Sequence, residues 1–330
     1  MLTKTAVSAD QVAALVAPLG VVARVEPLTG GLFASVQRVD LADGRRVVVK
    51  VTGADTSRLL RYERGLLGTE ASVDRLAHDA GIPVPRVLHV DATRAHVDGD
   101  ALVTTFLDGA LWSTLDLDEH ATARARRSLG GVMASLHRIT GDRFGYPAPE
   151  ARLGAATWPE AFAAMAHAVL DDAGRWGVPL PADRLRAAVE RHRGLLARVT
   201  TPRLVHADLW PGNLLLDPGA GTVVGVLDAE RALWGDPLFE LVGCDQLGVG
   251  AVDAGLLAGY RSAGGHLGLG DGTPGAGDPD AWTRLRLYRA YFACLLVVEV
   301  VPRGYTGPWV AEHEAAARAN LERMLTELGA

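Results

Sequence analysis

The fold is decided by the stretch VHADLWPGN at residues 205–213, which is followed by two short apolar runs and then by Asp228. Asp208 and Asn213 lie five positions apart in a loop that also contains Pro and Gly. The Asp-Pro-Gly sequence at 217–219 predicts a turn that folds the two apolar runs into a hairpin. The loop and the hairpin are expected to gather three oxygen-bearing side chains at one point. Such side chains can orient a hydroxyl group and hold Mg²⁺, so the pattern predicts a phosphoryl-transfer site.

The same residues resemble a known family. A His-x-Asp-x-x-x-x-Asn loop with a downstream Asp, followed by Gly-Asp-Pro at 235–237, is similar to the aminoglycoside phosphotransferase and choline kinase-like enzymes. These enzymes share the α+β, bilobal fold of protein kinases, with a small β-rich lobe and a larger, mainly helical lobe. The resemblance implies that Asp208 is the catalytic base and that Asn213 and Asp228 bind Mg²⁺. His206 is implied to brace the loop as a structural residue.

One position departs from the family pattern. The family usually has an aromatic residue after the second Asp, whereas this chain has Ala229. Each polar residue of the loop is, on its own, a common turn residue. It is the combined spacing, with apolar strands on both sides, that favours a site over a simple turn.

The composition limits the class of protein. A chain of 330 residues with 48% hydrophobic residues can form two lobes with cores of their own. A net charge of −6 argues against a nucleic-acid partner, because binding a phosphate backbone needs a concentrated basic face. Cys244 and Cys294 are far apart, so neither a disulfide framework nor a zinc site is predicted. No signal-peptide pattern and no membrane-spanning apolar run occur, which favours a cytoplasmic protein without a membrane partner.

Lys50 is the candidate nucleotide-binding lysine. It lies in the run Val47–Val51 with apolar residues on both sides, which is unusual for a lysine that faces solvent. A solvated lysine on an alternating strand is the alternative. The family resemblance identifies Lys50 as the lysine that contacts the α- and β-phosphates, normally held by a glutamate on a helix. A helix is predicted over residues 61–80, and Glu70 is preferred to Glu63 because its position matches the family; either glutamate can instead be a solvated helix residue.

Two further regions of the small lobe are expected to contact the nucleotide. Gly30 and Gly31 lie between two predicted strands and resemble the looser glycine loop of the family, although a glycine pair is also an ordinary turn. The strand that ends near Thr104 and Phe106 resembles the connection between the lobes, where backbone groups would bind the base of ATP or GTP. We therefore expect residues 1–105 to form the small lobe and residues 106–330 to form the large lobe.

In the large lobe, Asp236 is predicted to cap a helix that begins at Pro237. It follows Asp228 so closely that no long phosphorylated activation segment fits between them, which favours a small acceptor over a regulated protein kinase. The glycine-rich segment 262–279 is predicted to be a mobile loop, and Asp280 is predicted to cap the helix after it. Four side chains at helical spacing either line an acceptor pocket or belong to the core, which is the commoner place for them: Trp158, Phe162, Met165 and Trp176.

Together these patterns predict a small-molecule kinase, monomeric or homodimeric, that uses Mg²⁺ and ATP or GTP to phosphorylate a hydroxyl group. The resemblance favours an antibiotic acceptor of the aminoglycoside, macrolide or nucleoside type, and hence resistance by O-phosphorylation. The Asp-Leu-Trp run at 208–210 also resembles fructosamine kinases. A metabolic kinase of a sugar amine or amino alcohol, fructosamine kinase-like or choline kinase-like, is therefore the alternative. An inactive nucleotide-binding module is the second alternative, which the presence of every implied site residue argues against.

The acceptor-binding residues are the least defined part of the prediction. Trp210 and Glu230 are the candidates for contact with the acceptor. A cationic acceptor would need carboxylates around it, and Glu230, Asp245 and Glu299 are the candidates for that role. Each of these acids can equally be solvated or paired with a basic side chain.

Overall fold

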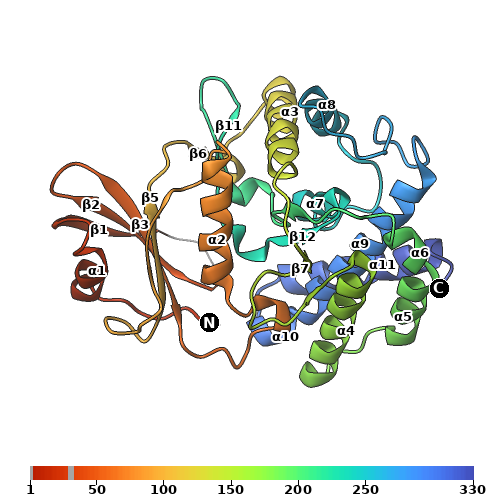
Figure 1. Cartoon of the computed structure of the whole chain (residues 1–330), viewed down its shortest axis with the longest axis horizontal. Coiled ribbons are helices and arrows are strands. Elements are labelled where there is room, and N and C mark those ends of the chain that lie inside the picture. Colours follow the sequence, from red (N-terminus) through yellow and green to blue (C-terminus); the bar gives the residue numbers. More distant parts are fainter. Residues whose placement is uncertain (1–2, 29–32) are drawn as a thin grey trace.

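The computed structural model describes residues 3–28 and 33–330 and has the predicted bilobal α+β fold. A sheet with one small helix lies at one end of the molecule and a larger helical body at the other (Figure 1). Helix α2 (Leu66–Asp79) stands between them. In the part of the chain that the structure describes, no helix is long and apolar enough to cross a membrane.

The small lobe is built on a five-stranded antiparallel sheet with the strand order β1-β2-β3-β5-β4. In the central strand β3, Val47, Val49 and Val51 point to one face and are buried with helix α1. The alternation places Lys50 on the opposite face, toward α2 and the large lobe. The elements of this lobe are α1 (Ala9–Val16), β1 (Val22–Leu28), β2 (Ser35–Leu41), β3 (Arg46–Gly53), β4 (Val87–Asp91) and β5 (Gly99–Thr105).

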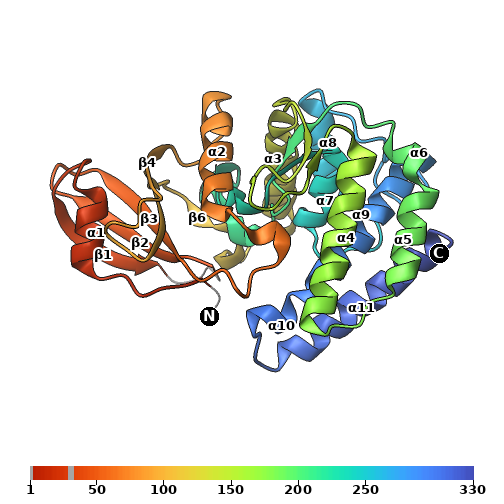
Figure 2. The same ribbon diagram turned by 60° about the horizontal axis from the view of Figure 1, so that its bottom comes forward.

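Helix α2 contributes to two hydrophobic cores. Leu67 and Ala71 pack against the sheet, whereas Val73 and Ala77 belong to the core of the large lobe. The large-lobe core also includes Leu60, which precedes the helix. Because its two faces are buried against different lobes, α2 is fixed between them (Figure 2).

The large lobe is organised around α9 (Pro279–Val298), a helix buried on nearly every side. α4 (Trp158–Trp176) and α11 (Trp309–Glu327) pack beside it. The remaining helices are α3 (Glu119–Leu136), α5 (Ala182–Arg191), α6 (Arg193–Leu196), α7 (Glu240–Cys244), α8 (Ala254–Ser262) and α10 (Val300–Arg303). Short 3₁₀ turns span Arg61–Glu63 (η1), Trp112–Thr114 (η2), Pro211–Asn213 (η3), Ala229–Arg231 (η4) and Pro237–Phe239 (η5).

Two small sheets carry the segments on either side of residues 205–213. One has the order β11-β10-β6 and contains the predicted hairpin, and the other has the order β8-β7-β12-β9. Residues 206–213 and 227–232 connect the two sheets, so they run next to each other. The strands are β6 (Ala110–Leu111), β7 (Phe144–Gly145), β8 (Gly154–Ala155), β9 (Arg203–Val205), β10 (Leu214–Leu216), β11 (Val223–Val226) and β12 (Leu233–Gly235).

The structure corrects two predicted helix starts. The helix predicted over residues 61–80 is interrupted, because Gly65 has a φ of 74° and separates η1 from α2. Glycine reaches this left-handed conformation without a steric cost, so it allows the chain to turn before the helix begins. At the start of α9 the capping residue is Asp278, whose side chain accepts the N–H of Asp280, and not Asp280 itself.

The glycine-rich segment 262–279 is a hydrogen-bonded turn structure, whereas a mobile loop was predicted. The carbonyl of Gly268 accepts the N–H of Asp278 at 2.7 Å, and that of Gly272 accepts the N–H of Val252 at 2.9 Å. Both glycines have positive φ, which explains why glycine is used there.

The aromatic candidates for an acceptor pocket are mostly core residues. Trp158, Phe162 and Met165 are completely buried, and the indole of Trp158 donates to the hydroxyl of Tyr288 at 2.8 Å. Only Trp176 is partly exposed, with the guanidinium groups of neighbouring arginines over its ring.

Candidate active site

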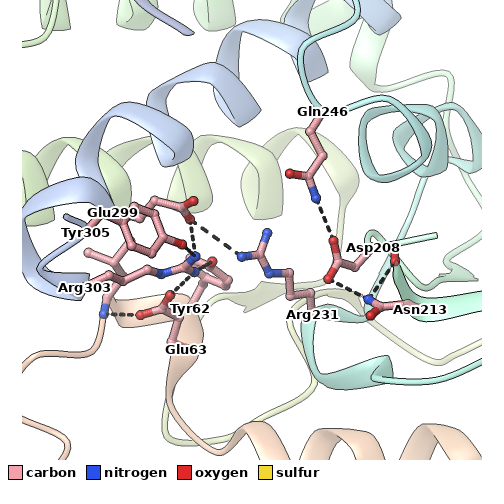
Figure 3. A network of polar contacts seen from close by, with 10 residues as sticks. Tyr62, Glu63, Asp208, Asn213, Arg231, Gln246, Glu299, Arg303 and Tyr305 are labelled. Atoms are coloured by element: carbon pink, nitrogen blue, oxygen red, sulfur yellow. Dashed lines mark hydrogen bonds and ion pairs between the residues drawn. The ribbon is translucent and has the colours of Figure 1, made fainter. Parts of the chain in front are cut away.

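Asp208 and Asn213 are brought into direct contact by the turn that follows β9. The side-chain amide of Asn213 donates to the Asp208 carboxylate at 2.9 Å and to its backbone carbonyl at 3.0 Å (Figure 3). Asp208 and Asn213 are both buried. Since the amide nitrogen faces Asp208, the amide oxygen of Asn213 remains available to a metal ion.

The backbone before Asp208 is held in an unusual conformation by α7. Ala207 has a φ of 63°, a left-handed value that is rare for a residue with a Cβ atom. The carboxylate of Glu240 accepts the N–H groups of His206 and Ala207, both at 2.8 Å. Burial alone would raise the pKa of Glu240, but His137 and His206 hold that pKa below its ordinary value. A buried, ionised Glu240 therefore stabilises the strained backbone of the loop through these two hydrogen bonds.

Asp228 is placed next to this pair by the β10–β11 hairpin. Leu214 pairs with Val226, and the N–H of Leu227 donates to the carbonyl of Asn213 at 2.9 Å. On the other side, Nε2 of His206 lies 3.1 Å from the carbonyl oxygen of Leu227. His206 is thus a buried brace between the loop and the segment that leads to Asp228. Asp228 itself has a φ of 62°, which turns the chain into η4 directly after it.

Lys50 connects the small lobe to this site. Its ammonium group donates to the carboxylates of both Glu70 on α2 and Asp228. Burial alone would lower the pKa of Lys50, but Asp228 and Glu70 raise it well above its ordinary value, so the lysine is charged. Glu63, the other candidate partner, instead pairs with Arg303 of α10.

The surroundings of Lys50 contain an excess of acids. Asp74, one turn beyond Glu70, is buried, and burial together with Glu70 raises its pKa to about 8. Burial, Asp228 and Glu70 likewise raise the pKa of Glu230 to about 8. In the described part of the chain, neither Asp74 oxygen has a hydrogen-bond partner, nor has the second oxygen of Glu70.

The oxygen atoms of Asn213 and Asp228 are suitable ligands for a magnesium ion that also binds a nucleotide. Asn213 and Asp228 supply an amide oxygen and carboxylate oxygens, the hard ligands that Mg²⁺ prefers. The described residues contain no group of three or more His, Cys, Asp or Glu side chains with metal-binding geometry. That is compatible with Mg²⁺, which commonly takes one or two protein ligands and completes its shell with phosphate oxygens and water.

Comparison with known proteins agrees with this arrangement. The family model described as the phosphotransferase enzyme family, APH, matches residues 24–288. The chain belongs to this family. An aminoglycoside 3'-phosphotransferase of Streptomyces fradiae is 30% identical over 175 residues, covering 51% of this chain and 60% of the relative. The match thus spans less than two thirds of that relative's length.

Solved structures show the same fold along nearly the whole chain of this family member. A thermostable mutant of an aminoglycoside phosphotransferase, solved with AMP-PNP and hygromycin B, has a TM-score of 0.62 at 19% identity, covering 96% of this chain and 98% of that one. A protein of Thermobifida fusca described as a fructosamine-3-kinase has a TM-score of 0.68 at 22% identity, covering 97% and 100%. Both kinds of kinase therefore share this architecture.

Of the four further residues predicted to contact the nucleotide in this phosphotransferase family member, the structure describes two. Gly30 and Gly31 lie outside the described residues. Thr104 is buried in β5, where it pairs with Val48. The N–H of Phe106 donates to the carbonyl of Arg46 at 3.1 Å, and arginine guanidinium groups lie over its ring. This N–H is therefore used within the sheet.

The acceptor-side candidates lie in different surroundings. Trp210 is 43% exposed, and its ring covers Gly212 so closely that a Cβ there would lie 2.2 Å from it. Asp245 is exposed. Glu299 is buried and forms ion pairs with Arg303 at 2.9 Å and Arg231 at 3.6 Å, so it is not free to bind an acceptor.

Asp236 has the geometry of a structural residue. Its carboxylate accepts the N–H of Leu238 at 3.1 Å, which caps η5. It also accepts Nε of Arg284 and the hydroxyl of Tyr288, both at 2.8 Å. These contacts tie the segment after the site to α9.

Three residues at the site were not found from the sequence. Glu240 supports the loop, Arg231 lies between Asp208 and Glu299, and Gln246 donates to Asp208 at 2.8 Å (Figure 3). For Glu240, the spacing after Gly-Asp-Pro is a possible signal, because it places a carboxylate in the first turn of a helix that returns to the loop. Nothing in the local sequence distinguishes Gln246 from a solvated loop residue.

Proposed function

We propose that this protein transfers the γ-phosphoryl group of ATP or GTP to a hydroxyl group of a small molecule. The observation that carries the proposal is one continuous chain of contacts from Asp208 through Asn213 and the hairpin to Asp228, Lys50 and Glu70. These residues come from both lobes, and each contributes the group that phosphoryl transfer uses.

In this proposal Asp208 accepts the proton of the acceptor hydroxyl as that oxygen attacks the γ-phosphorus, and the bond from the γ-phosphorus to the bridging oxygen breaks so that the nucleoside diphosphate leaves. Asn213 fixes one oxygen of Asp208 and presents its own amide oxygen to the metal, together with Asp228. When bound, Mg²⁺ would offset negative charge on the phosphates. Lys50, oriented by Glu70, would hold the triphosphate. Most of the rate enhancement then comes from positioning and from electrostatic stabilisation.

An antibiotic hydroxyl is our first choice of acceptor, because the curated relative is named an aminoglycoside 3'-phosphotransferase. Phosphorylation of such a hydroxyl would give resistance. The exposed ring of Trp210 lies two residues from Asp208 and offers an apolar face on which a sugar ring can pack.

A metabolic kinase of a sugar amine or amino alcohol is the second candidate. Glu299 is paired with arginines and the pKa of Glu230 is raised to about 8, so neither adds free negative charge to an acceptor site at neutral pH. Asp245 remains as an exposed acid on the loop that contacts Asp208. A single exposed acid suits an acceptor with one amine at least as well as a polyamine.

The test is a nucleotide-consumption assay with Mg²⁺ against a panel of aminoglycosides, macrolides, nucleoside antibiotics, sugar amines and amino alcohols. We expect turnover of at least one acceptor, and an Asp208→Asn variant should be at least about a thousandfold slower because it cannot act as a base. The exposed Asp98 provides a matched control, and Asp98→Asn should retain the wild-type rate.

Two outcomes would contradict the proposal. Near-normal turnover by Asp208→Asn would reject the role of that carboxylate. Magnesium-dependent nucleotide binding without turnover of any acceptor, and without slow hydrolysis by water, would instead indicate an inactive nucleotide-binding module.

A further inference from the structure

Gln246 contacts the carboxylate that the proposed function assigns as the base. Its side-chain amide nitrogen donates to Oδ1 of Asp208 at 2.8 Å, while the amide of Asn213 donates to Oδ2 at 2.9 Å (Figure 3). An ionised carboxylate can only accept hydrogen bonds, so both amides must present their NH₂ groups to it. Each oxygen of Asp208 is therefore held by a separate amide, and two such points fix the plane of the carboxylate.

The loop that carries Gln246 is itself anchored. The amide of Asn320 on α11 donates to the carbonyl of Leu247 at 2.8 Å. The guanidinium of Arg289 on α9 donates to the carbonyl of Gly250 at 3.0 Å. A side chain placed by a fixed backbone loses little further freedom when it hydrogen-bonds, so the contact with Asp208 has a small entropic cost.

The helix before this loop is fitted closely to the catalytic loop. Gly243 of α7 lies so near the backbone that a Cβ at this position would be 2.3 Å from the carbonyl carbon of Ala207. Glu240 at the start of the same helix binds the N–H groups of His206 and Ala207. α7 and the loop after it thus contact the backbone before Asp208 and, through Gln246, the side chain of Asp208.

We propose that Gln246 is a positioning residue for Asp208. It keeps the carboxylate plane fixed toward the acceptor hydroxyl, and it leaves a second lone pair of Oδ1 free to accept the proton. Asn213 alone restrains rotation about the Cβ–Cγ bond at one oxygen only, so the carboxylate plane is held less tightly without Gln246. This inference rests on the proposed function, in which Asp208 is the base, and it adds a residue from outside the 205–228 segment to that site.

The inference predicts that loss of the Gln246 hydrogen bond changes kcat but not the KM for the nucleotide. Loss of a hydrogen bond to a charged group, with the neighbouring group left in place, corresponds to roughly a tenfold to hundredfold change. We expect this change in kcat, because the orientation of the base matters during transfer. The KM for the nucleotide should stay the same, because Lys50 and Asp228 are not contacted by Gln246.

The experiment compares Gln246→Met, which keeps the length of the side chain but has no donor, with Gln246→Asn, which keeps the donor on a shorter side chain. The control is Gln37→Met on β2, which should retain wild-type activity. The rates are measured with the acceptor identified in the panel, or as slow Mg²⁺-dependent hydrolysis of the nucleotide if water is the only acceptor. Urea unfolding of each variant checks that the fold is unchanged.

The expected order of kcat is wild type, then Gln246→Asn, then Gln246→Met, with the last about 10- to 100-fold below wild type. A kcat of Gln246→Met within twofold of wild type, while Asp208→Asn is inactive, would overturn this inference and leave the proposed function standing. Wild-type turnover by Asp208→Asn would overturn both. Equal loss in the Asn and Met variants together with lower unfolding stability would show a merely structural role and would also overturn it.

Discussion

Two clusters of charged side chains lie near each other in this molecule, and their charge balance differs. The cluster at α10 contains two acids, Glu63 and Glu299, and two bases, Arg231 and Arg303. The cluster around Lys50 contains four acids. Lys50 contacts Glu70 and Asp228 directly, and its charge also acts on the pKa values of Asp74 and Glu230. The first cluster is neutral when fully ionised, whereas the second has a formal charge of −3.

This difference indicates different roles. A neutral, buried cluster satisfies its own charges and holds the N-terminal side of α2 to the large lobe. In the acidic cluster, burial and then the neighbouring carboxylates raise the pKa values of Asp74 and Glu230, because one lysine does not neutralise four acids. Excess acid is expected where a cation completes the site, and the Mg²⁺ ion of the proposed function is such a cation.

The largest effect is expected at Asp228. Replacement by Asn keeps its shape but removes the charge that faces Lys50 and that would face the metal. Turnover in the panel assay should fall by at least about a thousandfold. The fold should persist, because Lys50 keeps its ion pair with Glu70.

Circular dichroism and urea unfolding check that persistence. Asp217→Asn is unsuitable as a control, because Asp217 holds the hairpin turn, so Asp98→Asn again serves. An Asp228→Asn enzyme with more than a tenth of the wild-type rate would contradict the assignment of the acidic cluster to the metal–nucleotide complex.

Breaking the neutral cluster should instead affect stability. Arg303→Met removes one base and leaves Glu63 and Glu299 buried without it, so the free energy of unfolding should fall by about 3–5 kcal/mol. Urea unfolding measures this. The matched control is Arg186→Met, which breaks a solvent-exposed ion pair with Asp183 and should cost about 1 kcal/mol or less.

A second variant sharpens the interpretation of Arg303. If the loss comes from unpaired acids, replacing Glu63 and Glu299 by Gln in the Arg303→Met background should restore part of the stability. A triple variant that is less stable than Arg303→Met would show that packing, and not charge, determines the effect.

The smallest effect concerns Asp74 and depends on pH. The pKa of this carboxyl is about 8 in the folded protein and ordinarily 3.8, so between these values the folded state holds one more proton than the unfolded state. Stability therefore falls as pH rises from about 4 to about 8. Asp74→Asn does not titrate, so between pH 5 and pH 8 the wild type should lose about 1–3 kcal/mol relative to it.

The measurement is urea unfolding of both proteins at pH 5, 6.5 and 8. The groups that act on Asp74 are Glu70, Asp228 and Lys50, and all three are retained in the variant. Parallel stability curves for the two proteins would show that Asp74 does not titrate in this range.

The sequence was most informative about site residues that are close to one another along the chain. The spacing of Asp208, Asn213 and Asp228 predicts their proximity, because a short loop and a hairpin leave the chain few other paths. The contact between Lys50 and Glu70 was accessible for a similar reason, since a strand and the helix after it usually pack together. The identity of the family followed from these residues.

What the sequence did not reveal depends on contacts between distant segments. Arg303 and Glu63 are 240 positions apart, and no periodicity connects them. Gln246 meets Asp208 only because α7 turns back onto the loop of residues 205–213. The predicted start of α2 was wrong because the residues around Gly65 favour a helix, and the sequence did not show that Gly65 interrupts it.

The segment between β3 and α2 ties the two lobes together away from their peptide connection. Arg58 donates to the carbonyl of Pro302 at 2.6 Å, and the N–H of Arg61 donates to Asp172 at 2.7 Å. Together with the strand end near residue 105 and with α2, which packs against both lobes, this gives the sheet several attachments to the helical body. A shift of one lobe against the other therefore strains these contacts together with the ion pair between Lys50 of the sheet and Asp228 of the helical body.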